Sequence, residues 1–180
     1  MIRLFIGIEM PDWVSDELSR LGGGIPGARW VDSANHHLTL RFIGDVDGYQ
    51  HDRIERSLGG IVLESFTLSI GGVGHFPPRG HAKVLWAGVD ESDELNRLQR
   101  QIDRTLTSLQ HKPEGRKWYP HVTLARLSSN GNGDRVRSFL QGNSLLRLEP
   151  FLVTSFQLYQ STLHPDGARY EVMRSYPLTG

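Results

Sequence analysis

The chain has 180 residues, with 20 basic side chains, 20 acidic side chains and no cysteine. This length fits one domain or two small lobes that share a core. Without cysteine, disulfides and thiolate metal sites are excluded, and zero net charge argues against a protein that coats long nucleic acids. No stretch reaches the roughly 20 apolar residues of a membrane span. We expect a cytoplasmic monomer without membrane partners.

The first half of the chain alternates strands and helices. Residues 2–9 hold an apolar run that charged side chains interrupt at Arg3 and Glu9, so they predict a buried strand and not a signal peptide. The later elements expected here are a helix from Asp12 to about Leu21, a strand at 37–43, a helix at about 48–58 and a strand near 66–73.

The second half repeats this order after a predicted midpoint loop at Gly74–Gly80. Residues 92–110 predict the strongest helix, because leucine and isoleucine recur at helical spacing. The other expected elements are strands at 83–89, 119–125, 151–160 and 169–176, a helix at about 134–141, and a turn at His164–Gly167.

The matched order of the halves predicts a duplicated architecture. We expect residues 1–180 to form a single bilobal domain made of two duplicated halves, about 1–76 and 81–180. Strands of alternating polarity with helices between them indicate an α+β fold. The sheets should be largely antiparallel, with two pseudo-symmetric lobes, outer helices and a central cleft.

A His-x-Thr-apolar pattern occurs twice, at His37–Leu40 and at His121–Leu124, and 84 residues separate the two histidines. Side chains alternate between the faces of a strand. Each histidine therefore shares a face with the threonine two residues later, Thr39 or Thr123. The apolar residues of each motif should pack on the opposite face.

Two imidazoles and two hydroxyls on facing strands suit substitution at a phosphodiester. A neutral imidazole can remove a proton from water while an imidazolium protonates the leaving oxygen, because the ordinary histidine pKa is near 6.5. The threonine hydroxyls can donate to the non-bridging oxygens as charge develops there. This chemistry needs no metal and no cofactor, and it predicts a bell-shaped pH profile with a maximum between about pH 5.5 and 8.

Three segments resemble the two-histidine (2H) phosphoesterases, most closely the RNA 2',3'-cyclic phosphodiesterase or bacterial 2'-5' RNA ligase branch. They are Trp30–Val31 with His37–Gly44, then Val84–Gly88, then Trp118–Arg126. The resemblance covers nearly the whole chain. It implies a two-lobed α+β fold and hydrolysis of a 2',3'-cyclic phosphate at RNA 3' ends to a 2'-phosphomonoester.

The resemblance also implies roles for single residues. It makes His37 the proton donor to the leaving O3' and His121 the base that activates water, and it gives Arg126 a phosphate contact. Strand alternation alone would turn Arg126 away from His121, so a bulge or the strand end must redirect it. Phe42 stands at the same offset after His37, where it could stack a nucleobase or join the core.

Other functions keep part of this chemistry. The chain could be a non-catalytic module that binds RNA ends, or an enzyme acting on small cyclic nucleotides or on 2'-5' linkages, including reverse ligation. Retention of both histidines and both threonines favours an enzyme. His75 and His81 flank two prolines, but no carboxylate joins them at metal-ligand spacing. Zero net charge predicts that only the terminal few nucleotides are bound.

Overall fold

The computed structural model describes residues 1–128 and 132–180. Its centre is an antiparallel sheet of eight strands in the order β10-β9-β1-β3-β7-β6-β5, with the short β2 paired to β7. A second sheet joins β4 and β8. The strands are β1 Ile2–Glu9, β2 Arg29–Trp30, β3 His37–Val46, β4 Phe66–Leu68, β5 Ile70–Phe76, β6 Val84–Val89, β7 His121–Arg126, β8 Phe151–Val153, β9 Ser155–His164 and β10 Gly167–Pro177.

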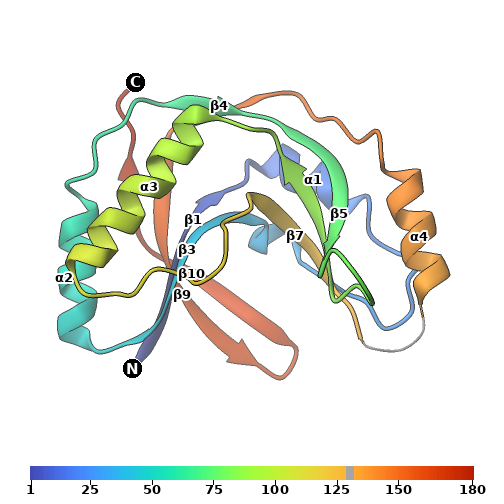
Figure 1. The fold of residues 1–180 in the computed structure, drawn as a ribbon, viewed down its shortest axis with the longest axis horizontal. Helices are drawn as coiled ribbons and strands as arrows, with labels where there is room; N and C mark the ends of the chain where they lie inside the picture. Colours follow the sequence, from blue (N-terminus) through green and yellow to red (C-terminus); the bar gives the residue numbers. More distant parts are fainter. Residues whose placement is uncertain (129–131) are drawn as a thin grey trace.

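Four α-helices flank the sheet within the part of the chain that the structure describes (Figure 1): α1 Asp12–Ser19, α2 Gly48–Leu58, α3 Asp93–Ser108 and α4 Gly133–Gly142. In Figure 1, α2 and α3 lie on one side of the molecule and α4 lies on the other. None of the described helices is both long and apolar enough to cross a membrane. The α+β class with largely antiparallel sheets and outer helices is confirmed.

Helix α3 shows how the sequence forms these elements. The Ser92 hydroxyl accepts a hydrogen bond from the backbone N–H of Leu95, which caps the first turn, and Asp93 and Glu94 complement the helix dipole there. Its apolar side chains lie on one face and are at most 1% exposed. They belong to the main core together with residues of β3 and β7. The helix covers the side of the sheet opposite the two histidines.

Two of the expected strands are each divided into two strands in the structure. The strand expected at 66–73 is two strands, because β4 pairs with β8 while β5 pairs with β6 in the main sheet. Residues 74–76 therefore belong to β5 and not to the predicted midpoint loop. Similarly, the strand expected at 151–160 divides into β8 and β9. Tertiary pairing decides these breaks, and a single-strand pattern does not reveal it.

The two sides of the sheet are built from exchanged segments. On the β3 side, the C-terminal strands β9 and β10 extend the sheet beyond β1, and they project as a long hairpin (Figure 1). On the β7 side, the edge strand β5 comes from before residue 81. The division into duplicated halves at about 76 and 81 stays a prediction. The meeting point of the two sides is the contact between β3 and β7.

Candidate active site

The two His-x-Thr strands lie next to each other at the centre of the sheet. Strands β3 and β7 are antiparallel, and Leu38 pairs with Val122. Continued for one residue in each direction, this register sets His37 across from Thr123 and Thr39 across from His121. The sequence predicted the two polar faces on opposite sides of a groove, whereas the structure places the two strands side by side in one sheet. We call the face that carries these two histidines and two threonines the motif face.

The opposite face of both strands is apolar core, as predicted. The four apolar motif residues are at most 1% exposed: Leu38, Leu40, Val122 and Leu124. The two strands also share one order of buried and exposed positions through their first six residues. This agreement supports the pseudo-symmetry of the site at the level of single residues.

Both strands carry an irregularity at the same place, the last residue of the motif. Thr39 and Arg41 pair with consecutive residues of β1, so the pairing skips Leu40. Thr123 and Ala125 likewise pair with consecutive residues of β6, so the pairing skips Leu124. A skipped residue inverts the alternation beyond it. The bulge that Arg126 needed is therefore present, and Phe42 is turned in the same way.

Each imidazole is held by a carbonyl of its own chain. The Nδ1 of His37 lies 2.7 Å from the Asn35 carbonyl oxygen, and the Nδ1 of His121 lies 2.7 Å from that of Tyr119. Because a carbonyl only accepts, each Nδ1–H donates, and the Nε2 of the neutral ring is left as the acceptor. The Nε2 of His37 lies 3.1 Å from the Thr39 hydroxyl. In both neutral rings Nε2 is thus the acceptor nitrogen.

Burial and nearby charge favour the neutral form of both rings. Burial is the main cause that lowers the pKa of His37 to about 4, and the charges of His121, His36 and Arg126 lower it further, against the hydrogen bond to Asn35. Burial followed by the charge of Arg126 lowers the pKa of His121, against the hydrogen bond to Tyr119. The cation of Arg126 thus acts on both histidines, and a bound anion would reverse its effect.

Aromatic rings pack around each histidine. The ring of His37 lies 4.9 Å from Phe5, 5.0 Å from Tyr170 and 5.9 Å from Tyr159, centroid to centroid. Gly7 makes room for this cluster, since a Cβ there would lie 2.9 Å from the Leu38 carbonyl oxygen and 3.6 Å from the His37 ring. The cluster is the apolar wall that desolvates His37.

The second histidine has its own aromatic neighbours. The ring of His121 lies 4.9 Å from Phe76 and 6.3 Å from Trp86, and Tyr119 packs against both of these rings. Gly74 is required here, because a Cβ would come within 2.3 Å of the indole of Trp86. Sequence reasoning missed the aromatic neighbours of both histidines. Their places on neighbouring strands become visible only once the strand order is known.

Phe42 is not a core residue. Its side chain is 57% exposed, and its ring lies 5.9 Å from that of Phe5, which in turn contacts His37. The backbone N–H of Phe42 donates to Glu114 Oε1 at 2.8 Å. An exposed ring beside the motif face is available for stacking, whereas the core alternative is wrong.

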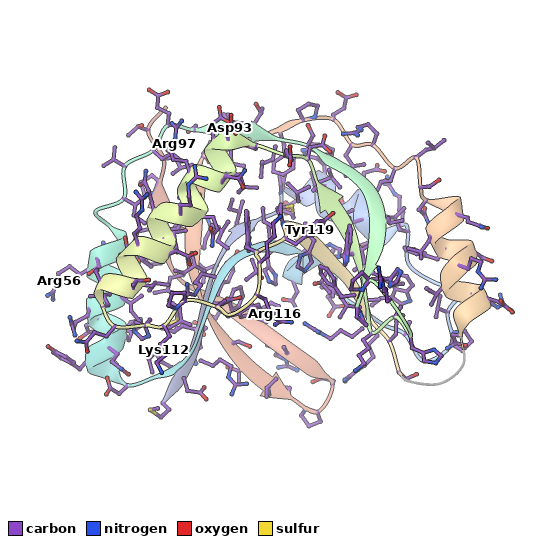
Figure 2. The ribbon with its side chains drawn as sticks, in the orientation of Figure 1. Arg56, Asp93, Arg97, Lys112, Arg116 and Tyr119 are labelled. Atoms are coloured by element: carbon purple, nitrogen blue, oxygen red, sulfur yellow. The ribbon has the colours of Figure 1, made fainter. Side chains whose placement is uncertain are left out.

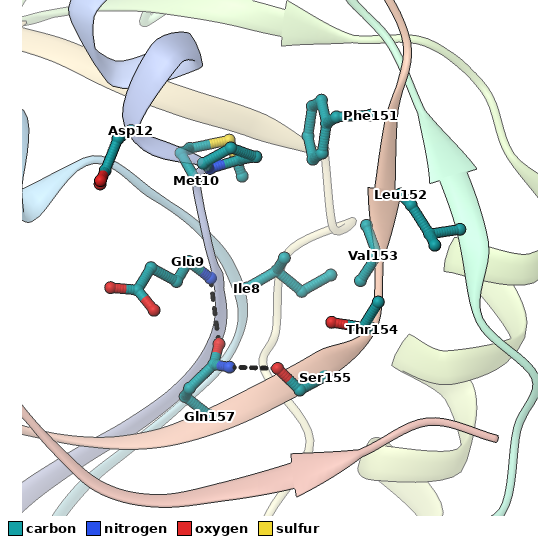
Figure 3. Close-up of a pocket in the computed structure, with 11 residues that line it drawn as sticks. Ile8, Glu9, Met10, Asp12, Phe151, Leu152, Val153, Thr154, Ser155 and Gln157 are labelled. Atoms are coloured by element: carbon teal, nitrogen blue, oxygen red, sulfur yellow. Dashed lines mark hydrogen bonds between the residues drawn. The ribbon is translucent and has the colours of Figure 1, made fainter. Parts of the chain in front are cut away.

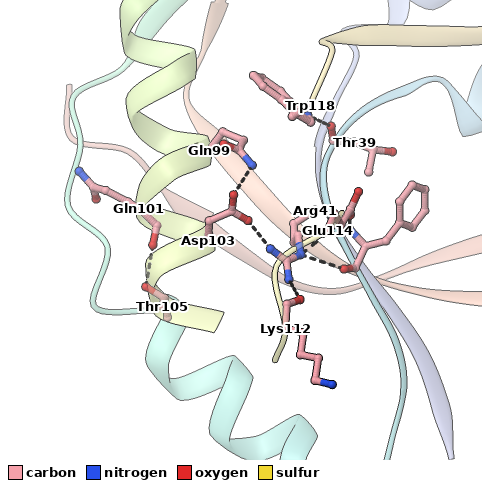
Figure 4. Close-up of polar contacts among 10 residues, drawn as sticks. Thr39, Arg41, Gln99, Gln101, Asp103, Thr105, Lys112, Glu114 and Trp118 are labelled. Carbon is pink, nitrogen blue, oxygen red and sulfur yellow. Dashed lines mark hydrogen bonds and ion pairs between the residues drawn. The ribbon is translucent and has the colours of Figure 1, made fainter. Parts of the chain in front are cut away.

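A buried arginine joins strand β3 to the segment before β7 (Figure 4). Arg41 is 3% exposed, forms an ion pair with Asp103 of α3, and donates to the carbonyl oxygens of Phe42 and Lys112. Glu114 lies 3.9 Å from the same guanidinium. These contacts hold the start of the loop 112–117 against β3.

The end of the same segment is also attached to β3. The indole N–H of Trp118 donates to the Thr39 carbonyl oxygen at 3.0 Å. The next residue, Tyr119, supplies the carbonyl that orients His121. The geometry of the second histidine is therefore tied to the strand of the first through side chains, in addition to the pairing of Leu38 with Val122.

Two cavities of the structure have neither His37 nor His121 in their lining. One of about 340 Å³ is lined by Glu9, Asp12, Gln157 and residues of β8 (Figure 3), and its carboxylates do not suit a phosphate. Another of about 320 Å³ lies beside the buried His36. Within residues 1–128 and 132–180, no group of three or more His, Cys, Asp or Glu side chains is placed to hold a metal ion.

The class of protein follows from the central pairing, because an α+β fold that brings two His-x-Thr strands together is that of the two-histidine phosphoesterases. The chain belongs to the 2'-5' RNA ligase superfamily, whose family model matches residues 28–164. A protein of Aeropyrum pernix named RNA 2',3'-cyclic phosphodiesterase is 34% identical over 151 residues, which cover 83% of this chain and 85% of the relative. One of the same name from Archaeoglobus fulgidus is 31% identical over 97% of this chain and 99% of its own.

Solved structures share the fold at lower sequence identity. The structure of TT0787 of Thermus thermophilus matches with a TM-score of 0.83 and 23% identity, and covers 99% of both chains. That of E. coli LigT complexed with 3'-AMP matches with a TM-score of 0.80 and 22% identity, again over 99% of both chains. These likenesses support the fold as a whole.

Proposed function

We propose that the chain hydrolyses 2',3'-cyclic phosphodiester ends of RNA to 2'-phosphomonoesters with His37 as general acid and His121 as general base. The observation that carries the proposal is the matched setting of the two imidazoles. Each lies on one of two paired strands, donates its Nδ1–H to a carbonyl, and keeps its Nε2 for proton transfer. The relatives named RNA 2',3'-cyclic phosphodiesterase support the substrate class.

In the proposed reaction the Nε2 of His121 takes a proton from water as the water oxygen attacks phosphorus. The P–O3' bond breaks, O3' receives the proton from the Nε2 of His37, and the phosphate stays on O2'. His121 leaves the step protonated and His37 neutral, and exchange with solvent restores both. In-line geometry requires the two imidazoles on opposite sides of the phosphorus atom, which strands from the two sides of the sheet can supply.

The negative charge on the non-bridging phosphate oxygens needs hydrogen-bond donors of its own. We propose that Thr39 and Thr123 donate to the non-bridging oxygens and that Arg126 pairs with the phosphate. The effect of the Arg126 charge on both histidines supports its closeness to the reacting group. We further propose that the exposed ring of Phe42 stacks on the terminal base.

The alternatives differ in product rather than in site. Ligation through a 2'-5' bond is the same chemistry in reverse, and a catalyst accelerates both directions, yet hydrolysis is favoured in water. Small cyclic nucleotides would use the same phosphate contacts. A module that only binds RNA ends has no need of two Nε2 acceptors held in place. A monomeric, cytoplasmic enzyme stays our expectation.

The deciding experiment is the identity of the product. An oligoribonucleotide that ends in a 2',3'-cyclic phosphate is incubated with the protein, with His37→Ala as the matched control, and the product is resolved by ³¹P NMR. We expect a 2'-phosphomonoester. A 3'-phosphate product would mean that the histidine roles are exchanged, and no turnover of any cyclic substrate would leave the binding module as the better interpretation.

A further inference from the structure

We propose that the loop 112–117 binds the phosphodiester backbone of the RNA strand next to its cyclic end. This inference rests on the proposed function, since it concerns how a chain substrate differs from a single cyclic nucleotide. All six residues of the loop are exposed, and three of them are cations: Lys112, Arg116 and Lys117. Figure 2 shows the labelled Lys112 and Arg116 on the loop that runs from the end of α3 toward the centre of the sheet.

The carboxylates near the loop do not neutralise these cations. Asp103 and Glu114 both face the buried guanidinium of Arg41, and Glu114 also accepts from the Phe42 N–H. Among the described residues, no carboxylate forms an ion pair with Lys112, Arg116 or Lys117. The loop therefore presents a net positive edge, which attracts phosphates.

The hairpin of β9 and β10 differs from the loop because its arginines are paired with carboxylates. Arg169 forms an ion pair with Asp166 at 3.3 Å, and Arg174 forms one with Glu55 at 2.6 Å. Surface pairs of this kind are weak, but each reduces the charge available to an RNA phosphate. Of these two segments, the unpaired cations favour the loop 112–117 as the one along which the RNA strand leaves the site.

The loop is also fixed and borders the motif face. Arg41 holds its start, and Trp118, directly after its end, donates to the carbonyl of Thr39. Two exposed aromatic residues adjoin the loop: Phe42, whose backbone N–H donates to Glu114, and Tyr119, which is 53% exposed and lies two residues after the loop. Exposed rings together with unpaired cations are the elements with which proteins bind single-stranded RNA without sequence preference.

The expected effect can be estimated from counter-ion release. A phosphate contact on a single strand contributes about 0.7 to the slope of log K against log salt. At about 0.1 M salt, that slope makes one contact worth roughly 5-fold and two contacts roughly 25-fold in affinity. Three contacts would give a slope near −2, which is shallow and agrees with binding of only the terminal few nucleotides.

The test compares one cyclic mononucleotide with oligoribonucleotides of increasing length that end in a 2',3'-cyclic phosphate. The variant is Arg116→Gln/Lys117→Gln. The matched control is Arg97→Gln/Arg100→Gln, which removes the same charge from α3. We expect the loop variant to lose roughly 25-fold in kcat/KM on the oligonucleotides at about 0.1 M salt, and less than about 2-fold on the mononucleotide. The control should change neither substrate.

Three other kinetic outcomes overturn the inference. Equal losses on both substrates would place the loop in the catalytic step, and equal losses in the α3 control would indicate a general field. Arg79 and Lys83 are exposed cations in the connection between β5 and β6. A loss confined to Arg79→Gln/Lys83→Gln would place the RNA strand on that side of the sheet instead. Binding of a fluorescent oligonucleotide with a 3'-phosphate, followed by anisotropy, tests the loop separately. If the protein hydrolyses no cyclic substrate but oligonucleotide binding still depends on Arg116 and Lys117, the proposed hydrolysis is refuted while the proposed binding of RNA by the loop 112–117 stands.

Discussion

Binding of an anion should raise the pKa of His37 enough to make it an acid at neutral pH. In the free protein the pKa of His37 is about 4, so only about one ring in a thousand is protonated at pH 7. Half-protonation at pH 7 requires a rise of about three units, or about 4 kcal/mol. A single negative charge at about 4 Å in an effective dielectric of about 20 supplies about 4 kcal/mol. Binding of the phosphodiester can therefore raise the pKa of His37 enough to protonate the ring at neutral pH.

This reasoning has a direct consequence for the pH profiles. In the free protein the pKa values of both histidines lie below the ordinary 6.5, and kcat/KM reports the free enzyme. Its maximum should therefore fall between about pH 4 and 6.5, lower than the range of about 5.5–8 that unperturbed histidines predict. The maximum of kcat, which reports the complex, should lie at higher pH. The apparent values belong to the pair and not to either ring.

The assay is an NMR titration of the histidine Cε1 protons, with and without inorganic phosphate, beside steady-state kinetics. Arg126→Gln should raise the pKa of both histidines in the free protein, because the arginine charge is among the causes that lower them. The matched control is Arg137→Gln, an exposed arginine of α4 paired with Asp134. A free His37 that titrates near its ordinary pKa of about 6.5, or one that ignores phosphate, would refute the argument.

Further changes have defined outcomes. His37→Ala and His121→Ala should each lower kcat by about 10²–10⁴-fold, with the fold intact by circular dichroism. The loss in the double variant should be far smaller than the product of the two single losses, because residues that act as a unit are non-additive. A wild-type kcat in either single variant would exclude that histidine from the proposed mechanism. Hydrolysis should survive excess EDTA, and loss that zinc or magnesium restores would contradict a reaction run by two imidazoles. Phe42→Ala should raise KM about 5- to 100-fold without lowering the free energy of unfolding if the ring stacks a base, whereas an unchanged KM would remove it from the site. Arg41→Met should lower the free energy of unfolding, measured in urea, by about 3 kcal/mol, which is near the low end for a broken buried pair because Asp103 stays partly exposed. The control is Arg104→Met, on the exposed surface of α3. Equally small losses in both variants would show that the buried pair contributes little to stability.

The sequence predicts what depends on local periodicity. Alternation placed His37 with Thr39 and His121 with Thr123, and it assigned the buried face of both strands correctly. The same rule places Arg126 on the face opposite His121 unless the strand is irregular. The irregularity is visible only against the partner strand, because a skipped residue is defined by two strands and not by one.

The surroundings of the histidines depend on contacts between distant segments. Tyr170 reaches the ring of His37 because β9 and β10 extend the sheet beyond β1. Phe76 reaches that of His121 because β5 continues past the predicted end of a strand. Strict alternation from Thr39 would place Arg41 on the motif face, yet the skipped Leu40 turns it into the molecule toward Asp103. Strand order and register decide all three, and neither follows from hydrophobic patterning alone.

The two motifs are chemically alike, so the direction of the reaction must come from the residues that differ between them. At the equivalent positions after the skipped residues stand Phe42 on one side and Arg126 on the other. An exposed ring suits a base, and a guanidinium suits a phosphate oxygen. A nucleotide whose base lies on Phe42 and whose phosphate faces Arg126 has only one orientation between the imidazoles. In the proposed function, the asymmetry at this single offset distinguishes the two motifs, with His37 proposed to protonate the leaving oxygen and His121 proposed to activate water.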